Sequence, residues 1–145
     1  KDLSSKVAII TGANSGSGFN TAKQLAKQKA TVILACRRPE AGKEAAAEVG
    51  GVFMDLDLSS LQSVRDFVKA FLSKYQRLDF LVNNAGVMQC PEGKTKDGFE
   101  TQFGTNHLGH FLLTYLLRDI LERSAPSRVI CVSSVAAGLS ALRSE

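Results

Sequence analysis

Residues 7–19 read VAIITGANSGSGF, and this stretch decides the fold that the rest of the chain completes. Residues 7–10 form an apolar run that is too short for a helix, so they predict a buried strand. A helical pattern follows over residues 17–29. We expect Gly12 to permit the sharp turn, Gly16 to let the backbone approach a pyrophosphate, and Gly18 to let the helix pack closely. Because free N–H groups at a helix N-terminus attract anions, this unit predicts a dinucleotide site; a merely structural turn is the alternative.

The rest of the chain repeats this strand-and-helix unit. Apolar runs predict further strands over residues 31–35, 52–54, 78–82 and 128–132. Apolar residues at helical spacing predict helices over residues 39–49, 59–72, 97–104 and 105–123, with a loop over 87–98. Ser59 and Gln62 have capping-box spacing at the start of one of them. We therefore predict an α/β fold: one Rossmann-like domain over residues 1–145, with a doubly wound parallel sheet of strand order 3-2-1-4-5.

Composition narrows the classes of function. Of the 145 residues, 44% are apolar and 22% charged, and the net charge of +4 is spread along the chain, which does not favour nucleic-acid binding. The three cysteines are far apart and lack CxxC spacing, so we expect reduced thiols and not a disulfide or metal site. No apolar run approaches the roughly 18 residues that a transmembrane helix needs, and no signal peptide is visible.

The residues after the second predicted strand indicate which dinucleotide is bound. An NAD site places an acidic residue there to bind the ribose hydroxyls. This chain instead has Arg37 and Arg38, and no acid before Glu40. Since arginine pairs with a 2′-phosphate, the sequence favours NADP(H); the alternative is that the two arginines are only a surface pair.

Several further motifs carry a resemblance to a known family. They are TGANSGSG at residues 11–18, LDL at 56–58, NNAG at 83–86, Asn106, and the serine pair at 133–134. Together they resemble the short-chain dehydrogenase/reductase family. Residues 83–117 are similar in particular to its retinol-dehydrogenase-like branch, which includes the WW-domain-containing oxidoreductase. The resemblance covers nearly all of the chain.

The resemblance implies roles for individual residues. It implies that Asp57 binds the adenine amino group, that Asn106 belongs to the catalytic proton relay, and that Ser134 hydrogen-bonds the substrate oxygen. Asn106 as a helix cap and Ser133 as a strand end are the structural alternatives. No metal site is expected, because His107 and His110 lack a third ligand. The expected cofactor-binding set is Gly12, Asn14, Ser15, Gly16, Ser17, Gly18, Arg37, Arg38, Asp57, Leu58, Asn83, Asn84, Ala85 and Gly86.

The implied activity is that of an NADP(H)-dependent oxidoreductase. It would interconvert a carbonyl and an alcohol on a small apolar substrate such as a retinoid, steroid or lipid aldehyde. One alternative is a catalytically silent cofactor-binding or interaction protein on the same scaffold. Another is a different Rossmann-type enzyme, such as a methyltransferase, against which NNAG, Asn106 and Ser134 argue.

The chain departs from the family in ways that bear on activity. The family's acid/base is a Tyr with a Lys four residues later, but here Asp79 and Asp119 follow Tyr75 and Tyr115 at that distance. We therefore expect this chain to hold the cofactor and to lack part of the active site. Ser17 stands where the family usually has an apolar residue, commonly Ile, and we expect this change to weaken packing or cofactor affinity without loss of the fold.

The family's fold continues beyond residue 145. We therefore expect the last strand to be an exposed edge, with Leu112, Leu116 or their neighbours uncovered. This chain is then a piece of a longer protein or a form that needs an oligomeric partner, and a homo-oligomer is expected. Any membrane association would come from segments outside this sequence. The expected location is intracellular, in the cytoplasm or at the face of the endoplasmic-reticulum membrane.

Overall fold

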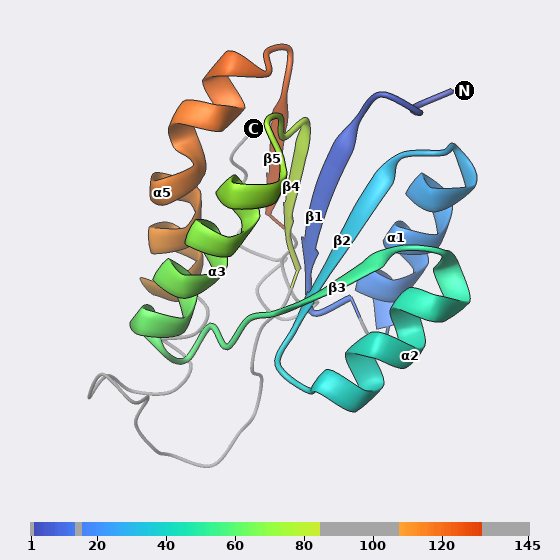
Figure 1. The fold of residues 1–145 in the computed structure, drawn as a ribbon, viewed down its shortest axis with the longest axis horizontal. Helices are drawn as coiled ribbons and strands as arrows, with labels where there is room; N and C mark the ends of the chain where they lie inside the picture. Colours follow the sequence, from blue (N-terminus) through green and yellow to red (C-terminus); the bar gives the residue numbers. More distant parts are fainter. Residues whose placement is uncertain (1, 14–15, 85–107, 132–145) are drawn as a thin grey trace, which may run out of the picture.

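A five-stranded parallel sheet forms the centre of the computed structural model, which describes residues 2–13, 16–84 and 108–131 (Figure 1). The strand order is β3-β2-β1-β4-β5, and every neighbouring pair is parallel. This confirms the predicted fold class and strand order. The strands are β1 (Val7–Thr11), β2 (Thr31–Cys36), β3 (Val52–Asp55), β4 (Phe80–Asn83) and β5 (Arg128–Cys131).

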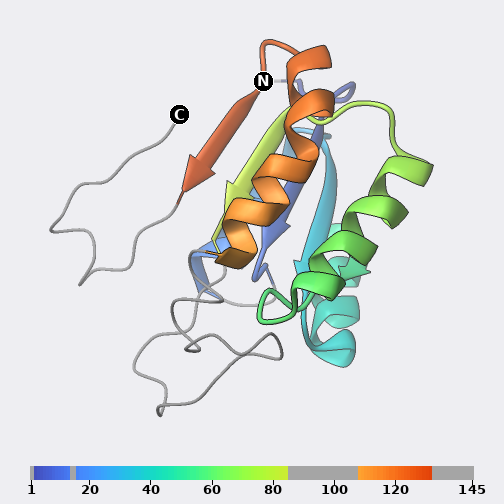
Figure 2. The same ribbon diagram turned by 90° about the vertical axis from the view of Figure 1, so that its left-hand side faces the viewer.

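Helices cover both faces of the sheet, as a doubly wound fold requires. The helices α3 (Leu61–Lys74) and α5 (His110–Arg123) lie side by side on one face (Figure 2). The helices α1 (Gly16–Lys27) and α2 (Pro39–Val49) cover the other face (Figure 1). The predicted loop over 87–98 and short helix over 97–104 lie outside the described residues.

The central strands are apolar throughout because both of their faces are buried. Ile9 pairs with Ile33 and Leu81 in register, and all three belong to the core beneath α3 and α5. The next residue, Ile10, pairs with Leu34 and Val82 in the core beneath α1 and α2. Successive side chains on a strand point to opposite faces, so one short run of sequence supplies both cores.

The predicted capping box at the start of α3 is wrong by one residue. Ser60 is the N-cap, and its hydroxyl oxygen accepts a hydrogen bond from the Ser63 N–H at 3.2 Å. Ser59 instead donates from its N–H and its hydroxyl to Asp57 Oδ1, at 3.0 and 2.5 Å. These two bonds close a turn that keeps Ser59 outside the helix, so the helix begins at Leu61.

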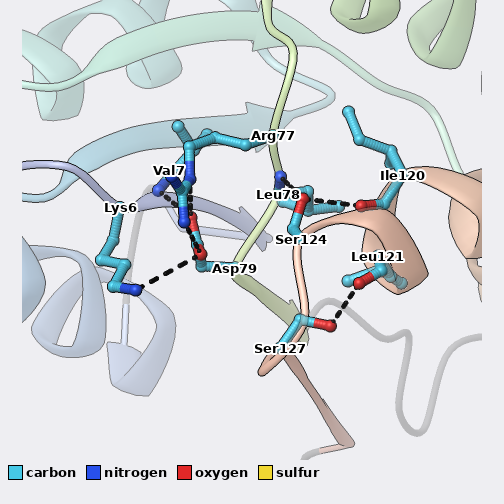
Figure 3. Close-up of polar contacts among 9 residues, drawn as sticks. All are labelled: Lys6, Val7, Arg77, Leu78, Asp79, Ile120, Leu121, Ser124 and Ser127. Carbon is cyan, nitrogen blue, oxygen red and sulfur yellow. Dashed lines mark hydrogen bonds and ion pairs between the residues drawn. The ribbon is translucent and has the colours of Figure 1, made fainter.

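The amino end of the sheet is held by the buried carboxylate of Asp79 (Figure 3). It accepts a hydrogen bond from the backbone N–H of Val7 at 2.8 Å and two hydrogen bonds from the Arg77 guanidinium at 2.7 and 2.9 Å. The Lys6 ammonium lies 3.8 Å from the same carboxylate. Burial alone would raise the pKa of Asp79, but the hydrogen bonds from Arg77 and Val7 and the charges of Arg77 and Lys6 outweigh it and lower that pKa. Asp79 therefore has a structural role, because it joins the beginnings of β1 and β4.

Ser124 and Ser127 fix the end of α5 at the same edge (Figure 3). The Ser124 hydroxyl accepts the Leu78 N–H at 2.9 Å and donates to the Ile120 carbonyl at 2.7 Å. The Ser127 hydroxyl donates to the Leu121 carbonyl at 2.6 Å. These bonds join α5 to the residues that lead into β4.

The apolar residues that α5 leaves exposed are neighbours of Leu112 and Leu116, the two leucines that the sequence predicted to be uncovered. Phe111 and Tyr115 are 69% and 50% exposed, whereas Leu112 and Leu116 pack partly against the core. On β5, which pairs only with β4 within the described residues, Ile130 is 43% exposed. No helix in the described part of the chain is long and apolar enough to cross a membrane.

Candidate dinucleotide site

The carboxyl ends of the parallel strands meet at one edge of the sheet, where ligands bind in doubly wound folds. The turn after β1 lies between the ends of β2 and β4. The Gly12 N–H donates to the Ala35 carbonyl at 2.9 Å, and the Asn84 N–H donates to the Thr11 hydroxyl oxygen at 2.8 Å. The structure thus brings the glycine-rich turn and the first half of NNAG together, as the sequence predicted.

The three glycines of the turn are required for different reasons. Gly12 and Gly16 have φ of +62° and +63°, a conformation that favours glycine. At Gly16 a Cβ would meet no atom within 4 Å, so backbone conformation alone explains it. At Gly18 a Cβ would lie 2.3 Å from Asn84 Nδ2 and 2.7 Å from the Gly12 carbonyl oxygen. The close approach at Gly18 is therefore to the turn and to Asn84.

Asn84 connects the end of β4 to both sides of the turn. Its backbone N–H reaches Thr11, and its Nδ2 lies 3.5 Å from the Gly12 carbonyl oxygen. Its Oδ1 accepts the Ser17 hydroxyl at 3.0 Å. Asn84 thereby contacts the last residue of β1, the first residue of the turn and the first turn of α1.

Thr11 and His110 were not recognised as site residues from the sequence. The Thr11 side chain is fully buried, and its Oγ1 lies 3.1 Å from His110 Nε2 and 3.4 Å from the Val82 carbonyl oxygen. His110 is the first residue of α5, so this contact joins α5 to the glycine-rich turn. The only sequence signal was a hydroxyl residue directly before Gly12. The described residues contain no group of three side chains suited to a metal ion.

Asn83 and Asn84 face different parts of the molecule. Asn83 is buried, and its Nδ2 donates to the Thr114 hydroxyl on α5 at 3.1 Å. The chain after β3 also packs against α5, since a Cβ on Gly109 would lie 2.4 Å from the Leu58 carbonyl oxygen. Asn83 and Leu58 therefore position α5 beside the site, whereas Asn84 positions the turn.

Arg37 and Arg38 follow β2 and are both exposed. Neither guanidinium forms an ion pair with another described residue. The two arginines line a pocket at the start of α2 together with Pro39, Glu40 and Ala41. Pro39 occupies the first turn of α2, and no side chain among the described residues caps that end. The pocket therefore offers two guanidinium groups and an uncapped helix N-terminus to an anion.

Asp57 lies just beyond β3, at the same edge of the sheet. Asp57 is half-buried. Its carboxylate accepts the two hydrogen bonds from Ser59, and its backbone N–H donates to the Ser63 hydroxyl at 2.9 Å. Asp55, the last residue of β3, is exposed and differs from Asp57 in its surroundings. The remaining predicted site residues lie outside the described ranges: Asn14, Ser15, Ala85, Gly86, Asn106 and Ser134.

A doubly wound parallel sheet with a glycine-rich turn after its first strand defines the class of Rossmann-like α/β domains. The family model described as short chain dehydrogenase matches residues 6–143. The chain belongs to this family.

Its relatives include retinol dehydrogenases. The chain is 51% identical to retinol dehydrogenase 12 of Mus musculus, over 90% of this chain and 44% of the relative. It is 51% identical to retinol dehydrogenase 13 of Homo sapiens, over 90% of this chain and 42% of the relative. The chain thus spans less than half the length of these curated relatives.

Solved structures of the same fold include two described with nicotinamide dinucleotides. The Pseudomonas aeruginosa RhlG/NADP active-site complex has a TM-score of 0.83 and 32% identity, over 99% of this chain and 60% of that one. The 3-ketoacyl-(acyl-carrier-protein) reductase from Brucella melitensis complexed with NADH has a TM-score of 0.81 and 31% identity, over 95% of this chain and 60% of that one.

Proposed function

We propose that residues 1–145 are the NADP(H)-binding domain of a short-chain dehydrogenase/reductase that interconverts a carbonyl and an alcohol on an apolar substrate. The observation that carries this proposal is the joint placement of two features at one edge of the sheet. These are the glycine-rich turn at the start of α1 and the pair Arg37 and Arg38 at the end of β2. NADP(H) has a phosphate group suited to each: the pyrophosphate for the turn and the 2′-phosphate for the arginines.

The glycine-rich turn fits the pyrophosphate. Residues with positive φ expose backbone at Gly12 and Gly16, and the α1 N-terminus supplies free N–H groups and a positive dipole. Asp57 is proposed to bind the adenine amino group, and Leu58 and residues 83–86 to shape the cavity around the cofactor. When bound, the nicotinamide supplies or accepts a hydride, and the protein supplies orientation.

The choice of NADP(H) over NAD(H) depends on the end of β2. The strand ends at Cys36 and not at an acidic residue, and it is followed by two arginines that form no ion pair within the described part of the chain. Glu40 lines the same pocket and opposes part of their charge, but the two positive groups outnumber it. The solved neighbours include both an NADP and an NADH complex, so support for NADP(H) rests on these arginines.

The substrate class rests on relatives. The curated proteins at 51% identity are named retinol dehydrogenases, which supports a retinoid as substrate. A steroid or a lipid aldehyde belongs to the same proposed class of apolar substrates. We propose that Ser134 hydrogen-bonds the substrate oxygen, where a donor stabilises developing negative charge, and that Asn106 belongs to the proton relay.

A catalytically silent protein on the same scaffold is a second candidate, because neither tyrosine is suited to acid/base catalysis. Tyr75 follows α3 at the amino side of the sheet, with its ring 5.0 Å from that of Phe71. Tyr115 lies on the exposed side of α5 beneath the Arg118 guanidinium, 3.9 Å from its ring centroid. If the protein is an active oxidoreductase, neither of these tyrosines is the residue that moves the proton.

Turnover by the full gene product that contains this chain distinguishes the two candidates. NADPH oxidation is followed with all-trans-retinal, a ketosteroid and a medium-chain aldehyde, while NADPH binding is measured separately. Consumption of any of these substrates supports the oxidoreductase. Binding of NADPH without turnover of any of them supports the silent protein, and absence of binding contradicts both.

A further inference from the structure

The hydroxyl of Ser17 lies where it can control the orientation of Asn84. Ser17 Oγ donates to Asn84 Oδ1 at 3.0 Å, across 67 residues of sequence. An amide group has an oxygen that accepts and a nitrogen that donates, so fixing one fixes the other. With Oδ1 held toward Ser17, Nδ2 faces the Gly12 carbonyl oxygen, 3.5 Å away.

The same orientation places the amide directly over Gly18. Nδ2 occupies the space that a Cβ on Gly18 would enter, at 2.3 Å. The first turn of α1, the glycine-rich turn and the end of β4 are therefore joined through one side chain. The first turn of α1 carries the N–H groups that the proposed function assigns to the pyrophosphate.

We propose that Ser17 is a positioning residue for the dinucleotide: its hydroxyl orients the Asn84 amide, which holds the glycine-rich turn in its binding conformation. This inference rests on the proposed function. It differs from a direct contact between Ser17 and the cofactor, and it differs from the expectation that a serine here only weakens binding. Ser17 is exposed, so its bond to Asn84 is modest in strength and the expected effect is modest too.

A double-mutant cycle tests the proposal, with the dissociation constant of NADPH as the readout. Ser17→Ala should weaken NADPH binding roughly two- to tenfold, the range expected for loss of one ordinary hydrogen bond. Ser17→Thr keeps the hydroxyl and should restore most of the affinity. Ser73→Ala is the matched control, because Ser73 is an exposed helical serine whose hydroxyl donates to the Ala70 carbonyl within α3, and it should leave binding unchanged.

The Asn84→Ala background separates positioning from direct contact. This variant keeps the backbone N–H that donates to Thr11 and removes only the amide. If Ser17 acts through Asn84, Ser17→Ala has no further effect there. An equal loss in both backgrounds overturns the proposal, as does unchanged binding in the single variant. Asn84→Ser serves as the background if thermal unfolding shows that Asn84→Ala does not fold.

Dinucleotide binding by the wild-type protein distinguishes failure of this inference from failure of the proposed function. If the wild type binds neither NADPH nor NADH, the proposed function fails. If the wild type binds NADPH and the cycle shows no coupling, only the role of Ser17 fails.

Discussion

The carboxylate of Asp79 accepts the backbone N–H of Val7 at 2.8 Å, and the Asp79 N–H donates to the Val7 carbonyl at the same distance. The Asp79 carbonyl in turn accepts the N–H of Arg128 at 2.9 Å. One residue thus joins the beginnings of β1, β4 and β5. The polar groups at the amino edge of the sheet hold the strands together, and those proposed to bind the cofactor lie at the opposite edge.

Asp79→Asn should therefore destabilise the fold without changing the cofactor site. The substitution removes the charge that pairs with Arg77 and Lys6 while the side chain stays buried. We expect a loss of about 2 kcal/mol in the free energy of unfolding, below the usual figure for a fully buried pair because Arg77 is partly exposed. Urea unfolding measures it. Asp66→Asn, at an exposed carboxylate on α3, should cost much less, and equal losses would contradict the role of Asp79.

The lowered pKa of Asp79 predicts a loss of stability in acid. Its pKa is lower in the folded chain than its ordinary value of 3.8, so folding favours the ionised form. Its contribution is fully present above the unfolded-state pKa and is lost as pH falls from there through the folded-state pKa. Urea midpoints measured across this acid range should fall less steeply for Asp79→Asn than for the wild type. Identical slopes would show that Asp79 is not the group responsible.

Replacing Arg37 and Arg38 together by alanine should weaken NADPH binding selectively. Charge-assisted hydrogen bonds to a phosphate contribute about 1.5–3 kcal/mol, so roughly a tenfold to hundredfold loss is expected. NADH lacks the 2′-phosphate and should bind nearly as before. Fluorescence titration measures both, with the double variant Arg65→Ala and Lys69→Ala on the exposed side of α3 as a charge-matched control. Equal losses for both dinucleotides would mean that the arginines do not read the 2′-phosphate.

Gly18→Ala should damage the cofactor site by a steric clash with the glycine-rich turn. The added Cβ would lie 2.7 Å from the fixed Gly12 carbonyl oxygen as well as against Asn84. We expect NADPH affinity to fall at least tenfold. Gly50→Ala is an informative control: Gly50 has φ of +78° at the end of α2, so alanine there should cost about 1 kcal/mol of stability and leave binding intact. Normal NADPH affinity in Gly18→Ala would contradict the proposal that the close contact between Gly18 and Gly12 shapes the cofactor site.

Local sequence patterns predicted the fold because each is a direct consequence of burial. The apolar runs around Ile9 and Ile33 are continuous because helices cover both faces, and glycines mark the turn that follows β1. The strand order followed from right-handed crossovers between parallel strands. Features that depend on residues close in the sequence were therefore largely predictable. The capping of α3 is the exception, because Ser59 bonds to Asp57 and the N-cap lies one residue later than predicted.

Contacts between distant residues could not be predicted in the same way. Nothing near Asp79 in the sequence indicates Val7. The sequence placed Ser17 and Asn84 in the same site, but nothing in it indicates the hydrogen bond between their side chains. His110 appeared only as half of a weak metal pair, whereas in the fold it lies against the buried Thr11 hydroxyl. These roles arise from strand register and from the packing of α5, which only the three-dimensional structure supplies.

Calorimetric titration of this chain with NADPH and with NADH tests the central claim most directly. We expect one NADPH to bind per chain and to bind more tightly than NADH, because the glycine-rich turn holds the pyrophosphate and Arg37 and Arg38 hold the 2′-phosphate. Absence of binding by a folded chain, or tighter binding of NADH, would contradict the central claim.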